Sequence, residues 1–298
     1  MQMKGVKLLA PEKGNKAWSD VVTFPLPGRS PKPRKSGITM IIDKGLGLAE
    51  TEDLLNLAAD YIDYIKLGFG TSALYSEKLL RDKIRLVKAY EVDIYPGGTF
   101  FEIAFSQNKF ESYLQRADNL GFTTLELSDG TIEISDEVRE YIVRKARAYG
   151  FKIITEVGKK RPEKNLSSGQ IACYANMDLA NGADWVIVEG RESGKGIGVF
   201  DNNGLVKKDT VDDIVRGLKD PSRVIWEAPL KDQQEKLISR FGPDVSLGNI
   251  QPYEILALES LRVGLRADTL QIALNREQTK PYKTLLNIPL LMPEPGKT

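Results

Sequence analysis

The chain has 298 residues, of which 41% are hydrophobic and 28% are charged, and its formal net charge is +1. This composition is typical of a soluble globular protein, and the balanced charge creates no overall field that would attract nucleic acid. The single cysteine, Cys173, excludes an internal disulfide framework and any site built from several cysteines. Because the chain contains no histidine, it has no imidazole to act as a general base or metal ligand. The chemistry must therefore rest on Asp, Glu, Lys, Arg, Tyr, Ser or a metal that prefers oxygen, such as Mg²⁺.

No stretch approaches the roughly 18 apolar residues of a membrane span, and residues 1–5 lack the continuous apolar run of a secretory signal. We therefore expect a cytoplasmic protein whose partners include neither a membrane nor a nucleic acid.

Eight short β-rich apolar runs recur along the chain, and each precedes a polar or glycine-containing turn and a helical pattern. The predicted strands span residues 38–43, 61–66, 92–95, 123–127, 152–156, 185–189, 224–227 and 245–250. Their ends are spaced by roughly 30 residues, which is the length of one βα unit.

Amphipathic helices are predicted between these strands, and three of them end at or just before a glycine that suits a left-handed cap: Gly121, Gly150 and Gly182. The predicted helices include residues 52–59, 77–90, 109–120, 136–149, 171–180 and 232–241. Eight such units predict one α/β domain, a single (β/α)8 barrel of the TIM type, in preference to an open doubly wound sheet.

The two ends of the chain differ from this repeat. Residues 1–36 contain five prolines and show no clear periodicity, which predicts an extended N-terminal arm. The barrel is expected over residues 37–270, and residues 271–298 are expected to form a C-terminal tail.

Charged residues gather where the predicted strands end, which is where the active sites of such barrels lie. These residues are Asp43, Lys44, Lys66, Glu126, Asp129, Glu156, Lys159, Lys160, Glu189, Arg191, Lys195 and Glu227. Carboxylates with interleaved cations can hold a divalent cation and a multiply charged anion together. The alternative is that these residues form ion pairs or cap the following helices. Glycine follows six of the eight strands and favours a ligand site, because it lets backbone amides approach an anion.

Two phosphate-binding motifs are incomplete. Residues 190–195 have three residues between the glycines instead of four, and Gly196 follows the lysine where Ser or Thr is required. Residues 194–198 also lack the dinucleotide spacing. The loop can still bind a phosphate through its amides with Arg191 or Lys195. Asn249, Arg262 and Arg266 offer a second phosphate site near the last strand, unless the two arginines form surface ion pairs.

Seven of the strand-end motifs, in order, resemble the phosphosulfolactate synthase family. The motifs are Ile42-Asp43-Lys44-Gly45, the run 66–72, Tyr95-Pro96-Gly97-Gly98-Thr99, Glu126-Leu127-Ser128-Asp129-Gly130, the run 155–160, the run 189–196 and Glu227-Ala228-Pro229. The similarity extends from about residue 36 to residue 268. The arm and the tail depart from the family pattern. These additions leave the catalytic motifs whole, so they bear on the predicted oligomeric state and not on the predicted site.

The resemblance implies a magnesium-dependent lyase that adds sulfite to phosphoenolpyruvate and gives 2-phospho-3-sulfolactate, with a lysine protonating C2. It also implies a homo-oligomer, with a trimer suggested. Neither chemical step requires histidine.

The candidate site residues follow from this chemistry. The expected Mg²⁺ shell draws on Glu126, Asp129, Glu156, Glu189 and Glu227, and the expected substrate-binding residues are Lys44, Lys66, Arg191, Ser193, Lys195 and Asn249. Lys160 is the favoured proton donor, because strand alternation places it on the same side as Glu156 if the chain stays extended for four more residues, and Lys159 is the second choice. Two alternatives remain: a non-catalytic stress-related or scaffold barrel, and a related magnesium enzyme that adds another nucleophile to phosphoenolpyruvate.

Overall fold

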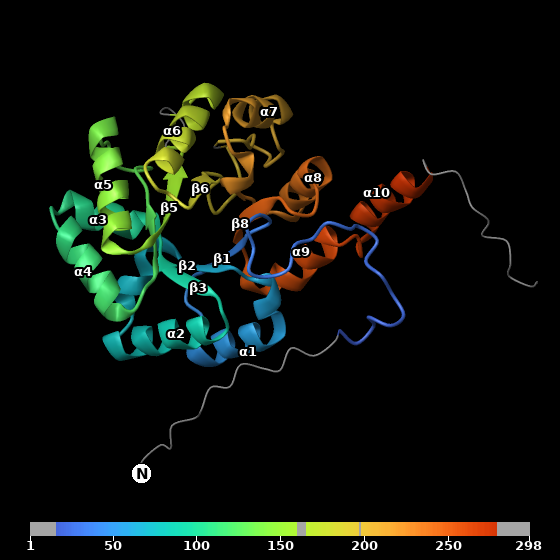
Figure 1. Ribbon diagram of the computed structural model, residues 1–298, viewed down its shortest axis with the longest axis horizontal. Coiled ribbons are helices and arrows are strands. Elements are labelled where there is room, and N and C mark those ends of the chain that lie inside the picture. Colours follow the sequence, from blue (N-terminus) through green and yellow to red (C-terminus); the bar gives the residue numbers. More distant parts are fainter. Residues whose placement is uncertain (1–15, 160–164, 197, 279–298) are drawn as a thin grey trace, which may run out of the picture.

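The computed structural model describes residues 16–159, 165–196 and 198–278, and it consists of eight parallel strands that alternate with helices (Figure 1). The strands are β1 (Thr39–Asp43), β2 (Tyr64–Leu67), β3 (Asp93–Pro96), β4 (Thr124–Leu127), β5 (Lys152–Val157), β6 (Trp185–Val188), β7 (Val224–Glu227) and β8 (Ser246–Ile250). The hydrogen-bonded order is β3-β2-β1-β8-β7-β6-β5-β4, and β3 and β4 lie beside one another at its two ends. The result is a nearly closed (β/α)8 barrel, as predicted.

The helices surround the sheet (Figure 1). They are α1 (Leu48–Ala58), α2 (Glu77–Ala89), α3 (Gly98–Ser106), α4 (Phe110–Leu120), α5 (Asp136–Tyr149), α6 (Ser168–Ala180), α7 (Lys208–Gly217), α8 (Lys231–Phe241), α9 (Ile255–Arg262) and α10 (Ala267–Gln278). Gly121 and Gly150 cap α4 and α5 with φ of 96° and 110°, which confirms the predicted left-handed caps. Among the described residues, none of the helices combines the length and the apolarity needed to cross a membrane.

Several predicted boundaries differ from the structure by a few residues, and two of these differences involve identified contacts. The second strand begins at Tyr64 and not at residue 61, because Tyr61 ends a 3-10 turn in which Ile62 N–H donates to the Ala59 carbonyl at 3.3 Å. At the other end, α10 continues through residue 270, where the tail was expected to begin. This helix packs against α8 and α9, and its Asp268 carboxylate lies 3.0 Å from Lys231 Nζ.

Two apolar cores stabilise the barrel. A large cluster lies between the strands and the surrounding helices, and a smaller one fills the barrel interior. The interior cluster consists of Ile38, Met40, Tyr64, Tyr95, Ile154, Trp185, Ile187 and Ile225. Because strand side chains alternate between the two faces, these residues define which positions of each strand point inward.

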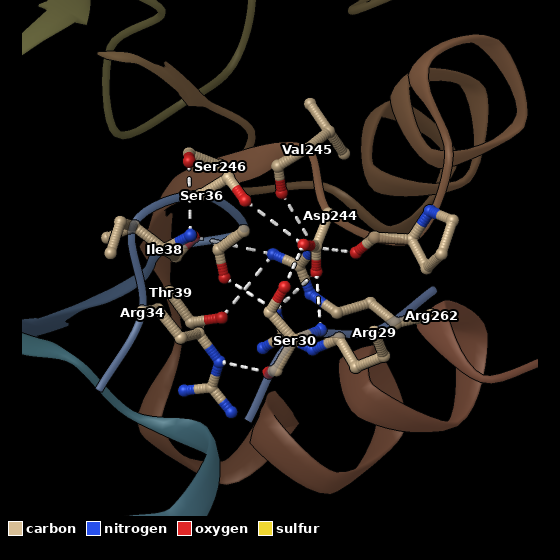
Figure 2. A network of polar contacts seen from close by, with 12 residues as sticks. Arg29, Ser30, Arg34, Ser36, Ile38, Thr39, Asp244, Val245, Ser246 and Arg262 are labelled. Carbon is tan, nitrogen blue, oxygen red and sulfur yellow. Dashed lines mark hydrogen bonds and ion pairs between the residues drawn. The ribbon is translucent and has the colours of Figure 1, made fainter. Parts of the chain in front are cut away.

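Residues 29–36, in the described part of the N-terminal arm, are bound to the barrel by a polar network around Asp244 (Figure 2). Ser30 N–H donates to Asp244 Oδ1 at 2.8 Å, and Arg29 Nε lies 2.9 Å from Glu259 Oε1. Arg34 Nη1 lies 3.1 Å from Asp63 Oδ1, just before β2. These contacts place residues 29–34 at the amino ends of the strands, opposite the ends where the expected site residues lie.

Arg262, which sequence spacing offered as a phosphate ligand, belongs to this same network (Figure 2). Its guanidinium is fully buried, and Nη1 donates to the Pro243 and Val245 carbonyls, both at 2.6 Å. Burial, with a further contribution from the nearby Arg29 charge, lowers the pKa of Arg262 to about 9. The suggestion of a phosphate site at Arg262 is therefore wrong, because the side chain points to the amino end of the barrel.

We expect Arg262→Met to lower the free energy of unfolding by about 3 kcal/mol, since it leaves buried carbonyls without donors. Arg266→Met is the matched control, because Arg266 lies four residues further along, between α9 and α10, and is partly exposed and 3.9 Å from Asp268; its effect should be within about 0.5 kcal/mol. Urea unfolding measures both, and equal effects would contradict the structural role of Arg262.

Candidate active site

The inward-facing positions of five strands change from apolar to charged at their carboxyl ends. Residues 64, 154, 187 and 225 belong to the interior cluster, and the residue two positions later in each case is Lys66, Glu156, Glu189 or Glu227. On β4, Leu125 and Leu127 face the helices, so Glu126 points inward between them. Side chains alternate between the two faces of each strand, and this alternation fills the barrel interior. The same alternation brings these five side chains together at one point.

Lys66 lies at the centre of this group. Its Nζ is 3.0 Å from Glu126 Oε1, 3.3 Å from Glu227 Oε1 and 3.4 Å from Glu156 Oε2. Carboxylate oxygens of Glu156, Glu189 and Glu227 all lie within 4.8 Å of one another. Four carboxylates and one ammonium give the buried group a formal charge of −3, which must be offset by a cation or by proton uptake.

The pKa values of two members reflect this crowding. Burial alone would lower the pKa of Lys66, but the charges of Glu126, Glu227 and Glu156 outweigh it and hold that pKa well above its ordinary range. Burial raises the pKa of Glu126, while Lys66 opposes the shift and Glu156 adds to it. Lys66 is therefore a fixed positive charge, and Glu126 holds a proton more readily than an exposed glutamate.

A cavity of about 340 Å³ opens above this group and is large enough for a small anionic substrate. It is lined by Ile42, Lys66, Gly68, Phe69, Gly97, Gly98, Thr99, Glu126, Glu156, Glu189, Arg191, Glu192, Ser193, Glu227 and Asn249.

Two glycines are required for the close packing of this cavity wall. Gly98 N–H donates to Glu126 Oε1 at 2.7 Å, and a Cβ at Gly98 would lie 2.4 Å from Ser128 Oγ. Gly190 N–H donates to Glu227 Oε2 at 3.0 Å, and a Cβ there would lie 2.6 Å from the Glu227 carbonyl oxygen. Both backbone amides thus orient carboxylates of the site, which only glycine permits at these distances.

The donor set fits a hard divalent cation. Glu156, Glu189 and Glu227 supply anionic oxygen ligands from three adjacent strands, which is the chemistry that Mg²⁺ prefers. Asn249, at the end of β8, lines the same cavity, and its buried Oδ1 has no hydrogen-bond partner among the described residues.

Most of the residues expected at the site line this cavity: Lys66, Glu126, Glu156, Glu189, Arg191, Ser193, Glu227 and Asn249. Lys44 lies at its edge, where it forms an ion pair with Glu192, and Lys195 is exposed. Asp129 and Lys159 are instead paired with each other, since Lys159 Nζ lies 2.6 Å from Asp129 Oδ2 and 2.8 Å from the Asp129 carbonyl oxygen. Lys160 lies outside the described residues.

Two features of the site were not assigned a role from the sequence. The N-terminus of α3 lines the cavity through Gly98 and Thr99, and the glycine pair before this helix is the signal that could have indicated it. Phe69 also lines the cavity, is 59% exposed and has a φ of 56°, which is unusual for a bulky residue. Its glycine neighbours on both sides are the corresponding signal.

A (β/α)8 barrel whose strand ends converge buried carboxylates and a lysine on one cavity defines an enzyme of the TIM-barrel class. A sequence model of the (2R)-phospho-3-sulfolactate synthase (ComA) family matches residues 27–268. The chain is 46% identical to a phosphosulfolactate synthase of Methanothermobacter thermautotrophicus over 83% of its own length and 96% of the relative's. It is also 46% identical to a phosphosulfolactate synthase of Methanocaldococcus jannaschii, over 78% of this chain and 93% of that one.

This protein belongs to the phosphosulfolactate synthase family, whose members are lyases that form a carbon–sulfur bond. Among solved structures, a fungal endo-β-N-acetylglucosaminidase of glycosyl hydrolase family 18 matches with a TM-score of 0.54 and 12% identity, over 76% of this chain and 98% of that one. At this identity the similarity shows the shared barrel alone.

Proposed function

We propose that the protein catalyses the magnesium-dependent addition of sulfite to the methylene carbon of phosphoenolpyruvate, giving (2R)-2-O-phospho-3-sulfolactate. Membership of the family and the 46% identity to two phosphosulfolactate synthases support this proposal. The observation that carries it is the convergence of Glu156, Glu189 and Glu227 beside Lys66 in one cavity.

The reaction transfers one electron pair and one proton. The sulfur lone pair of sulfite forms the new bond to C3, the π electrons of the C2–C3 double bond move toward C2 and the carboxylate, and a proton then adds to C2. A Mg²⁺ ion held by Glu156, Glu189 and Glu227 would act as a Lewis acid toward the charge that develops on the substrate carboxylate.

The chain's own residues account for binding and protonation in this scheme. Lys66 and Arg191 offset the anionic substrates, since both line the cavity and Lys66 remains charged. Gly98 and Gly190 hold Glu126 and Glu227 in place through their amides. Lys160 remains the proposed proton donor to C2 because it belongs to the run 155–160 that resembles the family. The proposal does not rest on strand alternation, since β5 ends at Val157 and Gly158 has a φ of 138°.

A non-catalytic barrel is disfavoured by the energetics of the site. Four buried carboxylates around one lysine repel each other and lose hydration, so a scaffold would gain stability by replacing them. Their presence is best explained by a function that needs the charge, as active sites commonly do.

Phosphorus NMR of phosphoenolpyruvate with sulfite, Mg²⁺ and the protein tests the proposal. We expect the enol phosphate signal of phosphoenolpyruvate to be replaced by that of an alkyl phosphate monoester, with a product mass larger by one sulfite. No change is expected when sulfite is omitted. Conversion with a thiol or another oxyanion but not with sulfite would support a related enzyme with a different nucleophile. No conversion with any nucleophile would reject the proposed reaction.

Substituting Arg191 by alanine should reduce kcat/KM for phosphoenolpyruvate by about 10-fold or more, which corresponds to one hydrogen bond to a charged group. Arg191 lines the cavity and has a φ of 61°, so its backbone follows an unusual path at this point. Arg191→Ala removes the charged side chain, whereas Arg191→Lys keeps the charge and removes the planar guanidinium. Steady-state kinetics of the two variants therefore separates these two contributions. Unchanged constants for the alanine variant would remove Arg191 from the site.

A further inference from the structure

Behind the cavity, a buried arginine on α5 connects the ends of β4 and β5. We propose that Arg139, together with Asp129 and Asp178, is a positioning residue that fixes the Glu156 carboxylate for cation binding. The inference rests on the proposed function only in taking Glu156 as a ligand of the cation. None of the three residues lines the cavity, so each would act through Glu156 and not on substrate.

Arg139 is 4% exposed and makes a bidentate contact with Asp178, from Nε to Oδ1 at 2.8 Å and from Nη2 to Oδ2 at 2.6 Å. The same Nη2 donates to the main-chain carbonyl of Glu156 at 3.1 Å. Arg139 therefore holds the backbone of the residue whose side chain points into the barrel. A planar guanidinium can make these contacts at once, whereas an ammonium cannot reproduce their geometry.

The third contact joins β4 to this arrangement. Arg139 Nη1 lies 2.8 Å from Asp129 Oδ1, and the other oxygen of that carboxylate accepts from Lys159 Nζ at 2.6 Å. Lys159 is two residues after the end of β5, and Arg139 contacts Glu156 on β5 itself. Asp129 and Arg139 therefore connect these two residues of the same chain segment. Asp129 and Lys159 thereby link the backbone after β4 to the backbone after β5.

The loop after β4 is anchored a second time, from α3. The buried Glu102 accepts from Ser128 Oγ at 2.5 Å and from Thr131 N–H at 2.8 Å. With Glu102 on one side and Arg139 on the other, residues 128–132 form a rigid support for Lys159 and, through Arg139, for Glu156. Preorganised support of this kind strengthens metal binding, because the ligands need not be ordered when the ion arrives.

The charges around Arg139 favour its ionised form. Burial alone would lower its pKa, but Asp178 and then Asp129 outweigh that effect and raise the pKa above its ordinary range. The guanidinium also lies over the ring of Tyr174, with its central carbon 5.6 Å from the ring centroid. The side chain is therefore held in place by two ion pairs and by this ring contact.

The test measures Mg²⁺ affinity by calorimetry and the metal dependence of turnover. We expect Arg139→Lys to weaken Mg²⁺ binding by about 10- to 100-fold, which is the usual effect of removing a partner of a metal ligand. At saturating Mg²⁺, kcat should return to within about threefold of the wild-type value, since the ligands themselves are present. Arg144→Met, which changes an exposed arginine on the same helix, should leave both quantities unchanged.

Removing Arg139 alone would leave Asp178 buried and unpaired and could unfold the protein. The double variant Arg139→Met with Asp178→Leu removes both charges, and we expect it to fold with the same weakened Mg²⁺ affinity. Wild-type Mg²⁺ affinity in Arg139→Lys or in the double variant would overturn the inference. A loss of turnover with an unchanged Mg²⁺ dependence would also overturn it, because such a loss indicates a purely structural role for Arg139. The inference also fails if the wild type binds no Mg²⁺. If the affinities change as expected but phosphoenolpyruvate and sulfite do not react, only the proposed function is wrong.

Discussion

Replacing Glu189 or Glu156 by glutamine is expected to weaken Mg²⁺ binding at least 100-fold and to reduce turnover at a fixed, subsaturating Mg²⁺ concentration by a similar factor. Each substitution removes one unit of charge from a group of three buried carboxylates whose oxygens lie within 4.8 Å of one another. At an effective dielectric of about 20, two unit charges about 4 Å apart interact by about 4 kcal/mol. A 100-fold loss, about 2.7 kcal/mol, is therefore a conservative expectation.

The same substitutions should not destabilise the metal-free protein. Because the buried group carries a formal charge of −3, losing one carboxylate relieves repulsion; we expect the melting temperature without metal to stay the same or rise by a few degrees. Calorimetric Mg²⁺ titration and thermal unfolding of the same samples check both expectations. Glu140→Gln, on the surface of α5, is the control.

Glu126→Gln provides a graded comparison. Glu126 bonds Lys66 and the Gly98 amide and lies outside the three-carboxylate group, so its effect on metal affinity should be smaller. Full activity of the wild type after exhaustive chelation would contradict the metal site altogether.

Lys160→Ala is expected to lose on the order of 100-fold or more in kcat while still binding Mg²⁺ and phosphoenolpyruvate, which is the usual scale for loss of a general acid. Without histidine in the chain, the proton must come from a lysine, a tyrosine, a protonated carboxyl or water. Lys159 is a poorer donor, because its ammonium is engaged by the carboxylate and carbonyl of Asp129. We therefore expect Lys159→Met to lose less, about 10-fold, through displacement of the loop.

Single-turnover kinetics with separately measured substrate binding distinguish the two lysines. A large loss in Lys159→Met with near-normal turnover in Lys160→Ala would move the proton donor to Lys159. If both variants remained active, neither lysine would be the donor. The proton would then come from elsewhere, that is, from a tyrosine, a protonated carboxyl or water.

The sequence by itself determined the repeat, the barrel and the end of the barrel at which the site lies. Eight β-rich apolar runs spaced by about one βα unit leave few alternatives to a closed barrel, and six of the eight strand ends carry a charged residue. Because the carboxyl ends of all the strands meet at one end of such a barrel, the sequence assigns Lys66, Glu156, Glu189 and Glu227 to one site, and all four line one cavity in the structure.

Only the tertiary structure decided which charged residues contact one another. Glu126 lies on β4 and Asp129 is two residues past its end. Glu126 nevertheless contacts Lys66 inside the barrel, whereas Asp129 contacts Arg139 and Lys159 outside it. Arg262 has the spacing of an exposed helical residue but is buried at the opposite end of the barrel. Side-chain partners of this kind come from helices and loops far away in the sequence, where no periodicity relates the two residues, so their pairing is fixed by how the helices pack around the sheet.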